Sequence, residues 1–386
     1  MLSLTAGGAT ISQLETPCLL LDEVRMTRNI ARLRCRLDRL GVAFRPHLKT
    51  AKSQEVASRL MSAPSGPAAV STLREAEVFA AHGVRDLLYA VGVAPGKLDR
   101  VAAIRAGGCD LAVILDSIEA TEAVTRYAAA TGARLPVLIE VDTDGHRGGV
   151  GWDDARQLVA IGRLLHEGGA ELRGVLAHAG ESYGCTSAAE LRAAAEQERA
   201  RATHSASILR NAGLPCPVVS TGSTPTAHFA EDLTGVTEVR AGVFVFFDLV
   251  MAGIGVCDLD DIAISVLATV IGRQPERGRL LVDAGWMAMS RDRGTARQKL
   301  DQGYGVACDV IGQPYTDLIM VEASQEHGIL ALRPGSAAAL PDLPLGAKVR
   351  ILPNHACPTA AQYDRYHVVQ PGAETVTAVW TRFGGW

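Results

Sequence analysis

Lys49 is the residue with the clearest capacity for covalent chemistry. It lies in the segment RPHLKTAKS, at the end of the first of several short strand-like runs. Side chains at the carboxyl ends of parallel strands form the active sites of barrel enzymes. A lysine amine that is partly desolvated there loses its proton near neutral pH and can attack a carbonyl group. Lys49 is therefore a candidate nucleophile, and the ordinary alternative is a solvated lysine, as we expect for Lys52.

Two later segments have the composition of a phosphate site. The sequence STGST covers residues 220–224, and the next strand-like run contains Arg240 and Gly242. In parallel barrels the loops after strands seven and eight commonly hold a phosphate, and glycine lets backbone N–H groups approach the anion closely. We therefore expect a phosphorylated cofactor or substrate at Gly222, Ser223, Thr224 and Gly242, with an ordinary Gly/Ser turn as the alternative.

Two further strand ends carry polar side chains. Arg147 lies among glycines in EVDTDGHRGGVG, where its guanidinium could bind an oxyanion. His178 and Tyr183 lie in LAHAGESYG, where they could place a flat ring and a phenol near the same site. A solvated turn arginine and simple barrel packing are the alternatives for these residues.

A candidate metal site lies near the C-terminus, in PNHACPT. His355 and Cys357 are two residues apart, so their side chains share one face if this segment is a strand. A thiolate with an imidazole favours zinc over magnesium or calcium, and two protein ligands leave positions for water or substrate. Glu326 and His327, in SQEHG, are candidate additional ligands or supporting partners. A buried free cysteine beside a core histidine is the alternative.

The elements that must position these residues indicate a parallel barrel. Eight strand-like runs occur between about residues 43 and 250, namely FRPHLKT, AAVSTL, DLLYAV, DLAVILDS, PVLIEVDT, LRGVLAHAG, PVVSTGST and EVRAGVFVF. Segments such as KLDRVAAIRAGG, with helical spacing and a closing glycine, separate them. This alternation predicts an α/β fold with a (β/α)8 TIM barrel. A doubly wound open sheet is the alternative, although no G-x-G-x-x-G follows the first strand.

The pattern changes after about residue 255. Strand-like runs without long helices follow: AISVLATVIG, GRLLVDAGWMAM, DLIMVEAS, GILALR, KVRILPN, YHVVQ and TVTAVWTRF. We predict an N-terminal strand within residues 1–22 that packs with either domain, a barrel over residues 23–255, and a C-terminal β domain with the metal site over residues 256–386.

Composition excludes several classes of protein. The chain has 386 residues and a formal net charge of -4 without a long basic run, so nucleic acid is not an expected partner. We find neither a signal peptide nor an apolar stretch long enough to span a membrane, and expect a soluble cytoplasmic protein. The eight cysteines are scattered and do not form a disulfide framework. Most of them are expected to be small core residues.

Taken together, the motifs identify a family. The segments RPHLKTAK, EVDTDGHRGGVG, HAGESYG, STGSTPT, EVRAGVFVFFD, VDAGWMAMSRDRG, QEHG and PNHACPT occur in order. The chain resembles, over essentially its whole length, the D-serine dehydratase and D-threonine aldolase group of fold-type III pyridoxal 5′-phosphate enzymes. The resemblance implies an alanine-racemase-like barrel, a homodimer, Lys49 as the Schiff-base lysine, and a divalent metal on His355 and Cys357. Zinc is the expected metal, with manganese as the alternative.

The resemblance also assigns roles around the cofactor. It implies that Gly222, Ser223 and Thr224 hold the phosphate, that Arg147 faces the phenolic oxygen, and that Tyr183 lies beside the ring. His178 and Gly242 are included among the expected cofactor-binding residues. In RAGVFVFFD, Phe244 stands where we expect tyrosine in this family, so no phenol role is assigned there.

The activity implied is the elimination of water from a β-hydroxy D-amino acid. D-threo-3-hydroxyaspartate, giving oxaloacetate and ammonia, or D-serine, giving pyruvate and ammonia, are the expected substrates. Arg291 and Arg293, in MSRDRGTARQ, could bind the second carboxylate of hydroxyaspartate, and a solvated basic loop is the alternative.

Four alternatives to dehydration remain. Retro-aldol cleavage to glycine and an aldehyde uses the same parts, but we expect aspartate in place of Cys357 in such aldolases. Racemisation would need a base on each face of the α-carbon and has no use for this metal. A non-catalytic carrier of pyridoxal phosphate would have no reason for PNHACPT, and a cofactor-free metallohydrolase lacks its expected ligand spacings in the barrel segment.

Overall fold

A computed structural model describes residues 8–386, which divide into two compact units. The barrel unit comprises residues 32–242 and 385–386, and the β unit comprises the residues up to Ala31 together with residues 243–384. Residues 1–7 of the predicted N-terminal segment lie outside the described residues. The predicted domain limits after residues 22 and 255 stay predictions.

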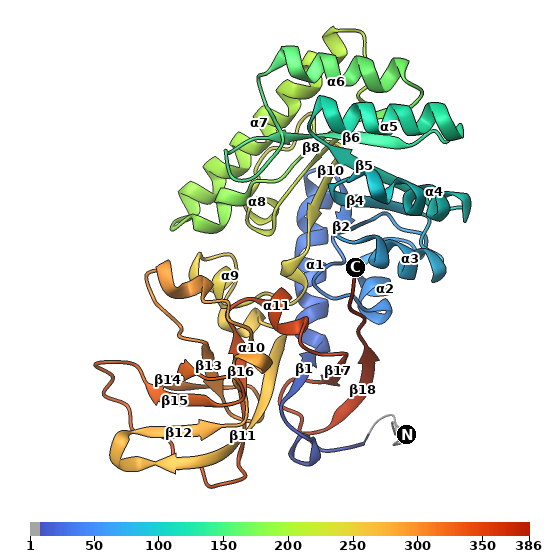
Figure 1. The fold of residues 1–386 in the computed structure, drawn as a ribbon. Coiled ribbons are helices and arrows are strands. Elements are labelled where there is room, and N and C mark those ends of the chain that lie inside the picture. The colour runs from blue at the N-terminus through green and yellow to red at the C-terminus, as the bar shows by residue number, and fades with distance from the viewer. Residues whose placement is uncertain (1–7) are drawn as a thin grey trace. The chain divides into compact units, whose positions relative to one another are not determined.

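The barrel unit alternates strands and helices, as the sequence predicts (Figure 1). Its strands are β2 (Ala43–Pro46), β3 (Ala68–Val70), β4 (Asp86–Gly92), β5 (Asp110–Leu115), β6 (Pro136–Asp142), β7 (Val150–Gly151), β8 (Glu171–Ala177), β9 (Val218–Thr221) and β10 (Glu238–Ala241). Its helices are α2 (Gln54–Leu60), α3 (Leu73–Ala81), α4 (Leu98–Ala106), α5 (Ile118–Thr131), α6 (Ala155–Glu167), α7 (Ala188–Asn211) and α8 (Thr224–Phe229). Helix α1 (Glu23–Arg39) spans the change from one unit to the other.

Local sequence explains where these helices begin and end. Helix α5 begins after Ser117, whose side chain accepts a hydrogen bond from the backbone N–H of Ala120, and it ends at Gly132 in the left-handed conformation. Thr72 and Asp154 cap α3 and α6 in the same way. These caps bond N–H groups that have no partner within the helix, so each crossover begins where its sequence signal lies.

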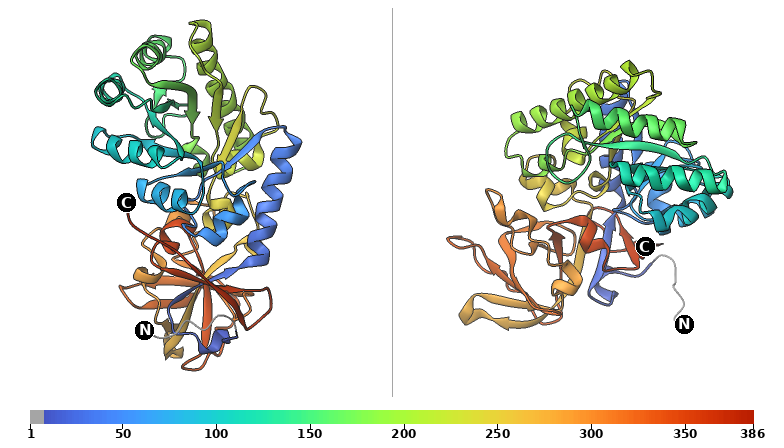
Figure 2. Two further views of the ribbon diagram at one scale, coloured as in Figure 1. Left: turned by 90° about the vertical axis from the view of Figure 1, so that its right-hand side faces the viewer. Right: turned by 45° about the horizontal axis from the view of Figure 1, so that its top comes forward.

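The eight main strands form a nearly closed parallel barrel. Their order is β2-β10-β9-β8-β6-β5-β4-β3, and β7 pairs with β6 off this path. An isolated parallel bridge between His47 and Ala69 joins the two ends of the order. The helices lie around the outside of the strands (Figure 2). The (β/α)8 prediction is therefore confirmed, and an open doubly wound sheet is excluded.

The barrel interior is filled by apolar side chains from alternate strand positions. One buried cluster comprises Ala69, Leu88, Ala112, Ile114, Leu138 and Leu176. It draws on β3, β4, β5, β6 and β8, so the barrel is a packed core rather than a pore. A packed core of this kind holds the strand ends, and the polar loops that follow them, in fixed positions.

The β unit contains mainly antiparallel strands and short helices. Its strands are β1 (Cys18–Asp22), β11 (Ile264–Gln274), β12 (Arg279–Val282), β13 (Gly305–Cys308), β14 (Pro314–Ala323), β15 (Gly328–Leu332), β16 (Lys348–Pro353), β17 (Arg365–Val369) and β18 (Val376–Thr381). Its short helices are α9 (Leu249–Gly253), α10 (Trp286–Met289) and α11 (Ala356–Ala360). The strand order is β12-β15-β14-β13-β16-β11-β1-β17-β18, and β12 also pairs with β11 to close six of the strands into a ring.

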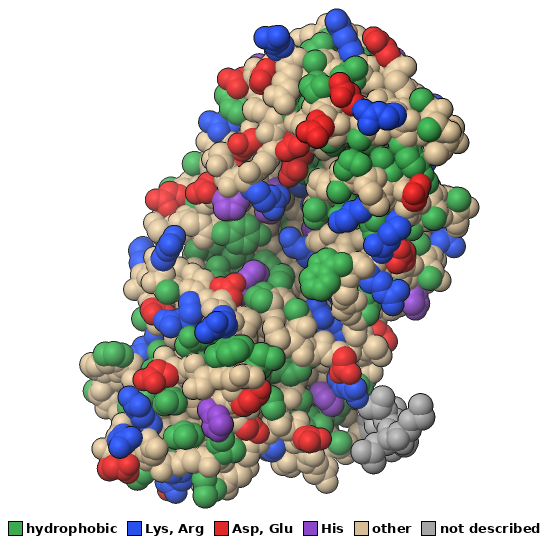
Figure 3. Space-filling view, viewed as in Figure 1, with side chains coloured by type: hydrophobic (Ala, Val, Ile, Leu, Met, Phe, Trp, Pro, Cys, Tyr) green, Lys and Arg blue, Asp and Glu red, His purple; other side chains and the backbone are tan. Residues whose placement is uncertain are grey.

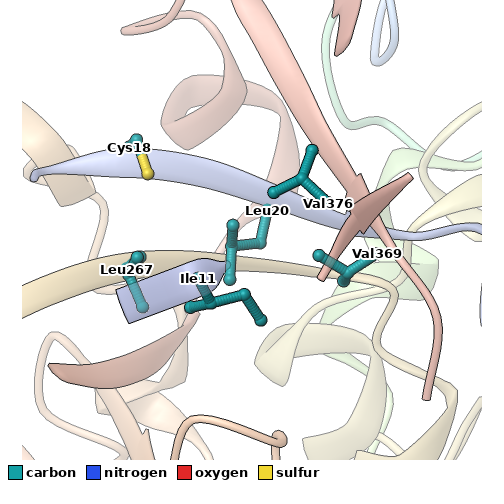
Figure 4. Packing of buried hydrophobic residues seen from close by; sticks show 6 residues of the cluster. All are labelled: Ile11, Cys18, Leu20, Leu267, Val369 and Val376. Carbon is teal, nitrogen blue, oxygen red and sulfur yellow. The ribbon is translucent and has the colours of Figure 1, made fainter. Parts of the chain in front are cut away.

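The N-terminal strand, which the sequence could not assign to a domain, belongs to this sheet. Strand β1 pairs in antiparallel fashion with β11 and in parallel with β17. Figure 4 shows the apolar cluster that accompanies this pairing, formed by Ile11, Cys18, Leu20, Leu267, Val369 and Val376. Burial of these side chains gives β1 its place in the sheet.

Two details of the β unit differ from the sequence prediction. Strand β13 was not expected, and the second half of the run GRLLVDAGWMAM forms α10 rather than strand. The chain turns at Gly285, where a Cβ atom would lie only 2.3 Å from the carbonyl oxygen of Ser324. Trp286 then donates its backbone N–H to that oxygen across 2.9 Å, which replaces a strand ladder at this point.

The distribution of charged side chains and the hydropathy of the helices are relevant to the expected absence of nucleic-acid and membrane partners. On the face shown in Figure 3, basic and acidic side chains are interspersed, without a continuous basic area among the residues drawn in colour. No helix in the described part of the chain is long and apolar enough to cross a membrane. All eight cysteines are free, and five of them are buried, as expected for small core residues.

Candidate active site and metal centre

Lys49 lies in a turn that follows the first barrel strand. Strand β2 ends at Pro46, one more pairing occurs at His47, and the exposed Lys49 comes two residues later. Its backbone N–H donates to Nδ1 of His47 across 3.4 Å. Burial, followed by the charges of Lys49 and Arg240, holds the pKa of His47 well below its usual value. His47 is therefore neutral and can accept this hydrogen bond.

Three cationic side chains act on His178, which follows β8. The Nδ1 atom of His178 donates to the carbonyl oxygen of Gly222 across 3.1 Å. Burial lowers the pKa of His178 to about 3, and the charges of Lys49, Arg240 and Arg147 contribute to the shift. Lys49 and Arg147 are thus close enough to His178 for their charges to lower its pKa. Cations around a neutral imidazole suit a phosphorylated, anionic cofactor.

The backbone at Gly222 approaches a neighbouring segment closely, which is one feature that we expected of a phosphate site. Gly222 has a φ of +120°, and a Cβ atom would lie 2.2 Å from the carbonyl oxygen of Arg240. Gly242 is also tight, because a Cβ atom would lie 3.3 Å from the hydroxyl of Thr50. Only glycine fits Gly222, so two chain segments can approach closely at the ends of β9 and β10.

The backbone N–H groups of this segment, which we expected to be available for phosphate, make hydrogen bonds within the protein. The N–H of Gly222 donates to Glu198 across 2.8 Å, and the N–H of Ser223 donates to the hydroxyl of Thr226 across 3.0 Å. Ser223 caps the short helix α8, with its hydroxyl 2.9 Å from that of Ser182. Two of the expected backbone donors are therefore already bonded within the protein. Binding of phosphate by Gly222, Ser223 and Thr224 stays a prediction.

Arg147 and Tyr183 lie in the loops after β6 and β8. Nη2 of Arg147 is 3.4 Å from Oε1 of Glu140, and its side chain is 59% exposed. The Tyr183 and His178 rings have centroids 6.3 Å apart. Both side chains lie at the carboxyl ends of barrel strands, where the sequence placed them. Their roles toward a cofactor stay predictions.

Two buried groups belong to this site, and the sequence pointed to only one of them. Arg240 was noted as part of the phosphate segment, but its guanidinium is buried and donates to Ser220 and to the carbonyl of Ala177, both across 2.6 Å. Glu198, in the middle of α7, was not considered. It accepts hydrogen bonds from the N–H groups of Ala179 and Gly222. Nothing in the sequence marks it among the other charged residues of that helix.

His355 and Cys357 come together in the β unit at the start of a helix, whereas the spacing argument had considered a strand. Strand β16 ends at Pro353, His355 is the N-cap of α11, and Cys357 lies in the first turn of that helix. Pro358 suits this turn, where N–H groups need no partner within the helix, and it could not donate in a strand ladder. The thiol of Cys357 hydrogen bonds with the His355 ring. The two side chains are therefore close together, because both lie at the start of α11.

Two aspartates that the sequence did not single out surround this pair. Oδ2 of Asp292 accepts a hydrogen bond from Nδ1 of His355 across 2.8 Å, and this bond lowers the pKa of Asp292. Oδ2 of Asp248 accepts the backbone N–H of Ala356 across 2.9 Å, and burial raises the pKa of Asp248. Burial opposes a charged His355 ring, but Cys357 and Asp292 outweigh it and raise the pKa of His355 to about 11.

These donors fit a divalent metal bound by two protein ligands. A thiolate and an imidazole suit zinc, and the bond from His355 to Asp292 is typical of a metal-binding histidine. Within residues 8–386 no three His, Cys, Asp or Glu side chains are grouped so that they could hold one ion. Glu326 and His327, both exposed in the turn between β14 and β15, are thus not brought into such a group.

The two predicted substrate arginines have different surroundings. Arg293 lies 2.7 Å from Asp301 and 4.9 Å from the centroid of the Tyr304 ring. Arg291 is exposed, and its guanidinium lies 4.7 Å from the centroid of the Trp286 ring. Arg293 is thus paired with a carboxylate, whereas Arg291 is stacked on an aromatic ring. Phe244, the departure noted in the sequence, is fully buried.

Comparison with known families agrees with this fold and site. Residues 21–250 match the alanine racemase N-terminal domain, and residues 263–369 match a putative serine dehydratase domain. The chain belongs to the D-serine dehydratase and D-threonine aldolase group of alanine-racemase-like proteins.

Among its relatives is the D-threo-3-hydroxyaspartate dehydratase of Delftia sp. HT23. That protein is 53% identical over 98% of this chain and 99% of its own length, and its solved structure gives a TM-score of 0.94. D-serine dehydratase of Dictyostelium discoideum is 30% identical, with 93% of this chain and 94% of the relative covered. D-threonine aldolase of Filomicrobium marinum is 26% identical, covers 97% of this chain and 96% of its own, and has a TM-score of 0.82.

One further solved structure concerns the metal. It is a cysteine-to-alanine variant of D-threo-3-hydroxyaspartate dehydratase, described as a metal-free form. That chain is 52% identical to this one, with 98% of this chain and all of the other covered and a TM-score of 0.94. The description of this relative as a metal-free form indicates that it also has a metal-bound form.

Proposed function

We propose that the protein is a pyridoxal 5′-phosphate- and metal-dependent dehydratase that acts on a β-hydroxy D-amino acid. D-threo-3-hydroxyaspartate is the proposed substrate and D-serine the second candidate. One structural observation carries the proposal, namely the grouping of Lys49, Arg147 and Arg240 around the neutral ring of His178. Similarity over the whole chain to a dehydratase of this substrate supports it.

Pyridoxal phosphate, when bound, would supply an electron sink for the carbanion at the α-carbon. Lys49 would be the residue that holds the cofactor covalently, and its Nζ atom would serve as the base for the α-proton of the substrate. His178, kept neutral and held at Nδ1 by Gly222, would lie beside the cofactor ring without adding charge to it. Arg147 would neutralise the phenolic oxygen of the cofactor, and buried Arg240 adds positive charge to the site.

A metal on His355 and Cys357 would supply a Lewis acid for the departing hydroxide, which is otherwise a poor leaving group. The reaction removes the proton from the α-carbon and hydroxide from the β-carbon, which together make water. Hydrolysis of the resulting enamine gives an oxo acid and ammonia. The imidazole of His355 is oriented by Asp292, and the turn that carries both ligands is held by Asp248.

Retro-aldol cleavage is the second candidate, because a D-threonine aldolase shares the fold. Cys357 favours dehydration, since we expect aspartate at this position in aldolases. We also propose zinc as the metal, with manganese as the alternative, a homodimer as the assembly, and a cytoplasmic location. These finer assignments rest on the sequence and on the family resemblance.

Product analysis tests the proposal directly. The purified protein, loaded with cofactor and metal, would be mixed with D-threo-3-hydroxyaspartate, D-serine and D-threonine, and the products identified. Ammonia with oxaloacetate or pyruvate is expected from the first two. Glycine with an aldehyde would favour the aldolase. Unchanged substrates with a bound cofactor would favour a non-catalytic carrier.

A further inference from the structure

Asp292 connects the metal-binding histidine to a constrained loop. Its Oδ2 atom accepts from Nδ1 of His355 across 2.8 Å, and its Oδ1 atom accepts from the backbone N–H of Gly294 across 2.8 Å. The backbone N–H of Asp292 donates to the hydroxyl of Ser290 across 3.1 Å. Ser290 has a φ of 75°, which is unusual for a residue with a side chain. The loop is thus fixed on both sides of Asp292.

The backbone around His355 is held by other residues. Asp248 bonds the N–H groups of Ala356 and Met251, each across 2.9 Å. Asn354 accepts from the hydroxyl of Thr295 across 2.5 Å. These contacts position the turn, but they do not touch the imidazole. Rotation and protonation of the ring are therefore left to Asp292 and to Cys357.

We propose that Asp292 is the positioning residue of the metal centre, because it fixes the His355 ring with its proton on Nδ1 and so leaves Nε2 to bind the metal. This inference rests on the proposed assignment of the metal to His355 and Cys357. Carboxylates in this position commonly change metal affinity by about 10- to 100-fold when they are removed. Asp292 contributes without being a ligand itself.

The substitution Asp292→Asn separates this role from simple support of the loop. An asparagine oxygen can still accept the N–H of Gly294, so the turn is kept. Its amide nitrogen then faces His355, and it can only donate a hydrogen bond. Nδ1 of the ring would have to accept, which places the proton on Nε2, the nitrogen that the metal needs. Asp292→Asn should therefore weaken metal binding even though the fold is intact.

Cobalt(II) titration of the full-length holoenzyme tests this inference. Thiolate-to-cobalt absorption reports the metal at Cys357, and competition with zinc gives the relative affinities. We expect Asp292→Asn and Asp292→Ala to weaken binding about 10- to 100-fold and to shift the cobalt bands. Asp342→Asn is the matched control, because it removes an exposed carboxylate of the same unit that pairs with Arg273.

The outcomes distinguish this inference from the proposed function. Equal cobalt affinity and equal spectra in the Asp292 variants and the unmodified protein would overturn the role of Asp292 alone. If the unmodified protein gives no thiolate-to-cobalt absorption, or if Cys357→Ala retains it, the metal assignment itself is wrong. Far-UV circular dichroism and the bound-cofactor absorbance are expected to match in all variants. A loss of either in Asp292→Asn would mean that Asp292 supports the fold instead.

Discussion

The Nδ1 atom of His178 donates to the carbonyl oxygen of Gly222 across 3.1 Å and so joins the ends of two neighbouring strands, β8 and β9. Because a carbonyl oxygen can only accept, the bond places the ring proton on Nδ1. The low pKa of His178 means that Nε2 carries no proton at neutral pH. A ring held in this way can lie flat against a cofactor, since its orientation and charge are both fixed.

Stability of the cofactor-free protein should fall as the pH is lowered below about 6.5. The pKa of His178 is about 3 in the folded protein, so the unfolded chain takes up a proton first. The stability contributed by the neutral ring is therefore complete above about pH 6.5 and is lost as the pH falls toward 3. Between pH 7 and pH 5 the cost is about 2 kcal/mol.

Urea unfolding of the parent and of His178→Gln at several pH values measures this effect. The difference in stability between them should change by about 2 kcal/mol over the range from pH 7 to pH 5. His82→Gln is the control, because the His82 ring also bonds a backbone carbonyl, at Val78, but is exposed. Equal pH dependence in all three proteins would show that His178 is not held neutral.

Gly222→Ala should destabilise the barrel unit and weaken binding of pyridoxal phosphate. Its φ of +120° is unfavourable for alanine, and the new Cβ atom would lie 2.2 Å from a backbone oxygen of Arg240. We expect a loss of about 2 kcal/mol or more in unfolding free energy. Gly184→Ala is the control, since nothing lies within 4 Å of its Cβ position. Thermal melts and cofactor titration are the measurements, and equal values for the two variants would contradict the prediction.

Glu198→Ala should disturb two loops of the site at once. The carboxylate accepts the N–H groups of Ala179 and Gly222 and the hydroxyl of Thr226, so its removal leaves buried donors without their acceptor. We expect destabilisation on the order of 2 to 5 kcal/mol. Glu196→Ala, which removes an exposed partner of Arg199 on the same helix, should cost less than about 1 kcal/mol. Denaturant midpoints together with cofactor affinity measure both effects, and an unaltered Glu198→Ala protein would refute the argument.

The sequence predicted the parts of the fold that depend on local patterns. Eight strand-like runs and the helices between them gave the barrel, because hydrophobic periodicity and caps act over a few residues. Closure through His47 and Ala69 is a contact between distant segments, and the sequence carries no local signal for it.

Site residues could be predicted from the sequence where they belong to a motif. They could not be predicted where the fold brings together residues that are distant in the sequence. Lys49, His355 and Cys357 were proposed from strand ends and ligand spacing, which are visible in the sequence, and from the family resemblance. Asp292 lies 63 residues from His355 along the chain, so its contact with this proposed metal ligand follows only from the fold. The spacing of His355 and Cys357 was considered only for a strand, because a single proline among apolar residues does not show that a helix begins there.

Arg291 should determine recognition of a second substrate carboxylate more strongly than Arg293. The guanidinium of Arg293 is already paired with Asp301 across 2.7 Å, whereas that of Arg291 is exposed and stacked on Trp286. A stacked guanidinium keeps its hydrogen-bonding edge and can bind a carboxylate. Loss of one charged hydrogen bond costs about 1.5 to 3 kcal/mol, so Arg291→Gln should raise the KM for D-threo-3-hydroxyaspartate about 10- to 100-fold. The KM for D-serine, which has no second carboxylate, should change little.

Steady-state kinetics of Arg291→Gln and Arg293→Gln with both substrates test this prediction. Unchanged hydroxyaspartate kinetics in Arg291→Gln would show that the carboxylate is bound elsewhere, and a larger effect in Arg293→Gln would mean that its pairing with Asp301 is exchanged for the substrate.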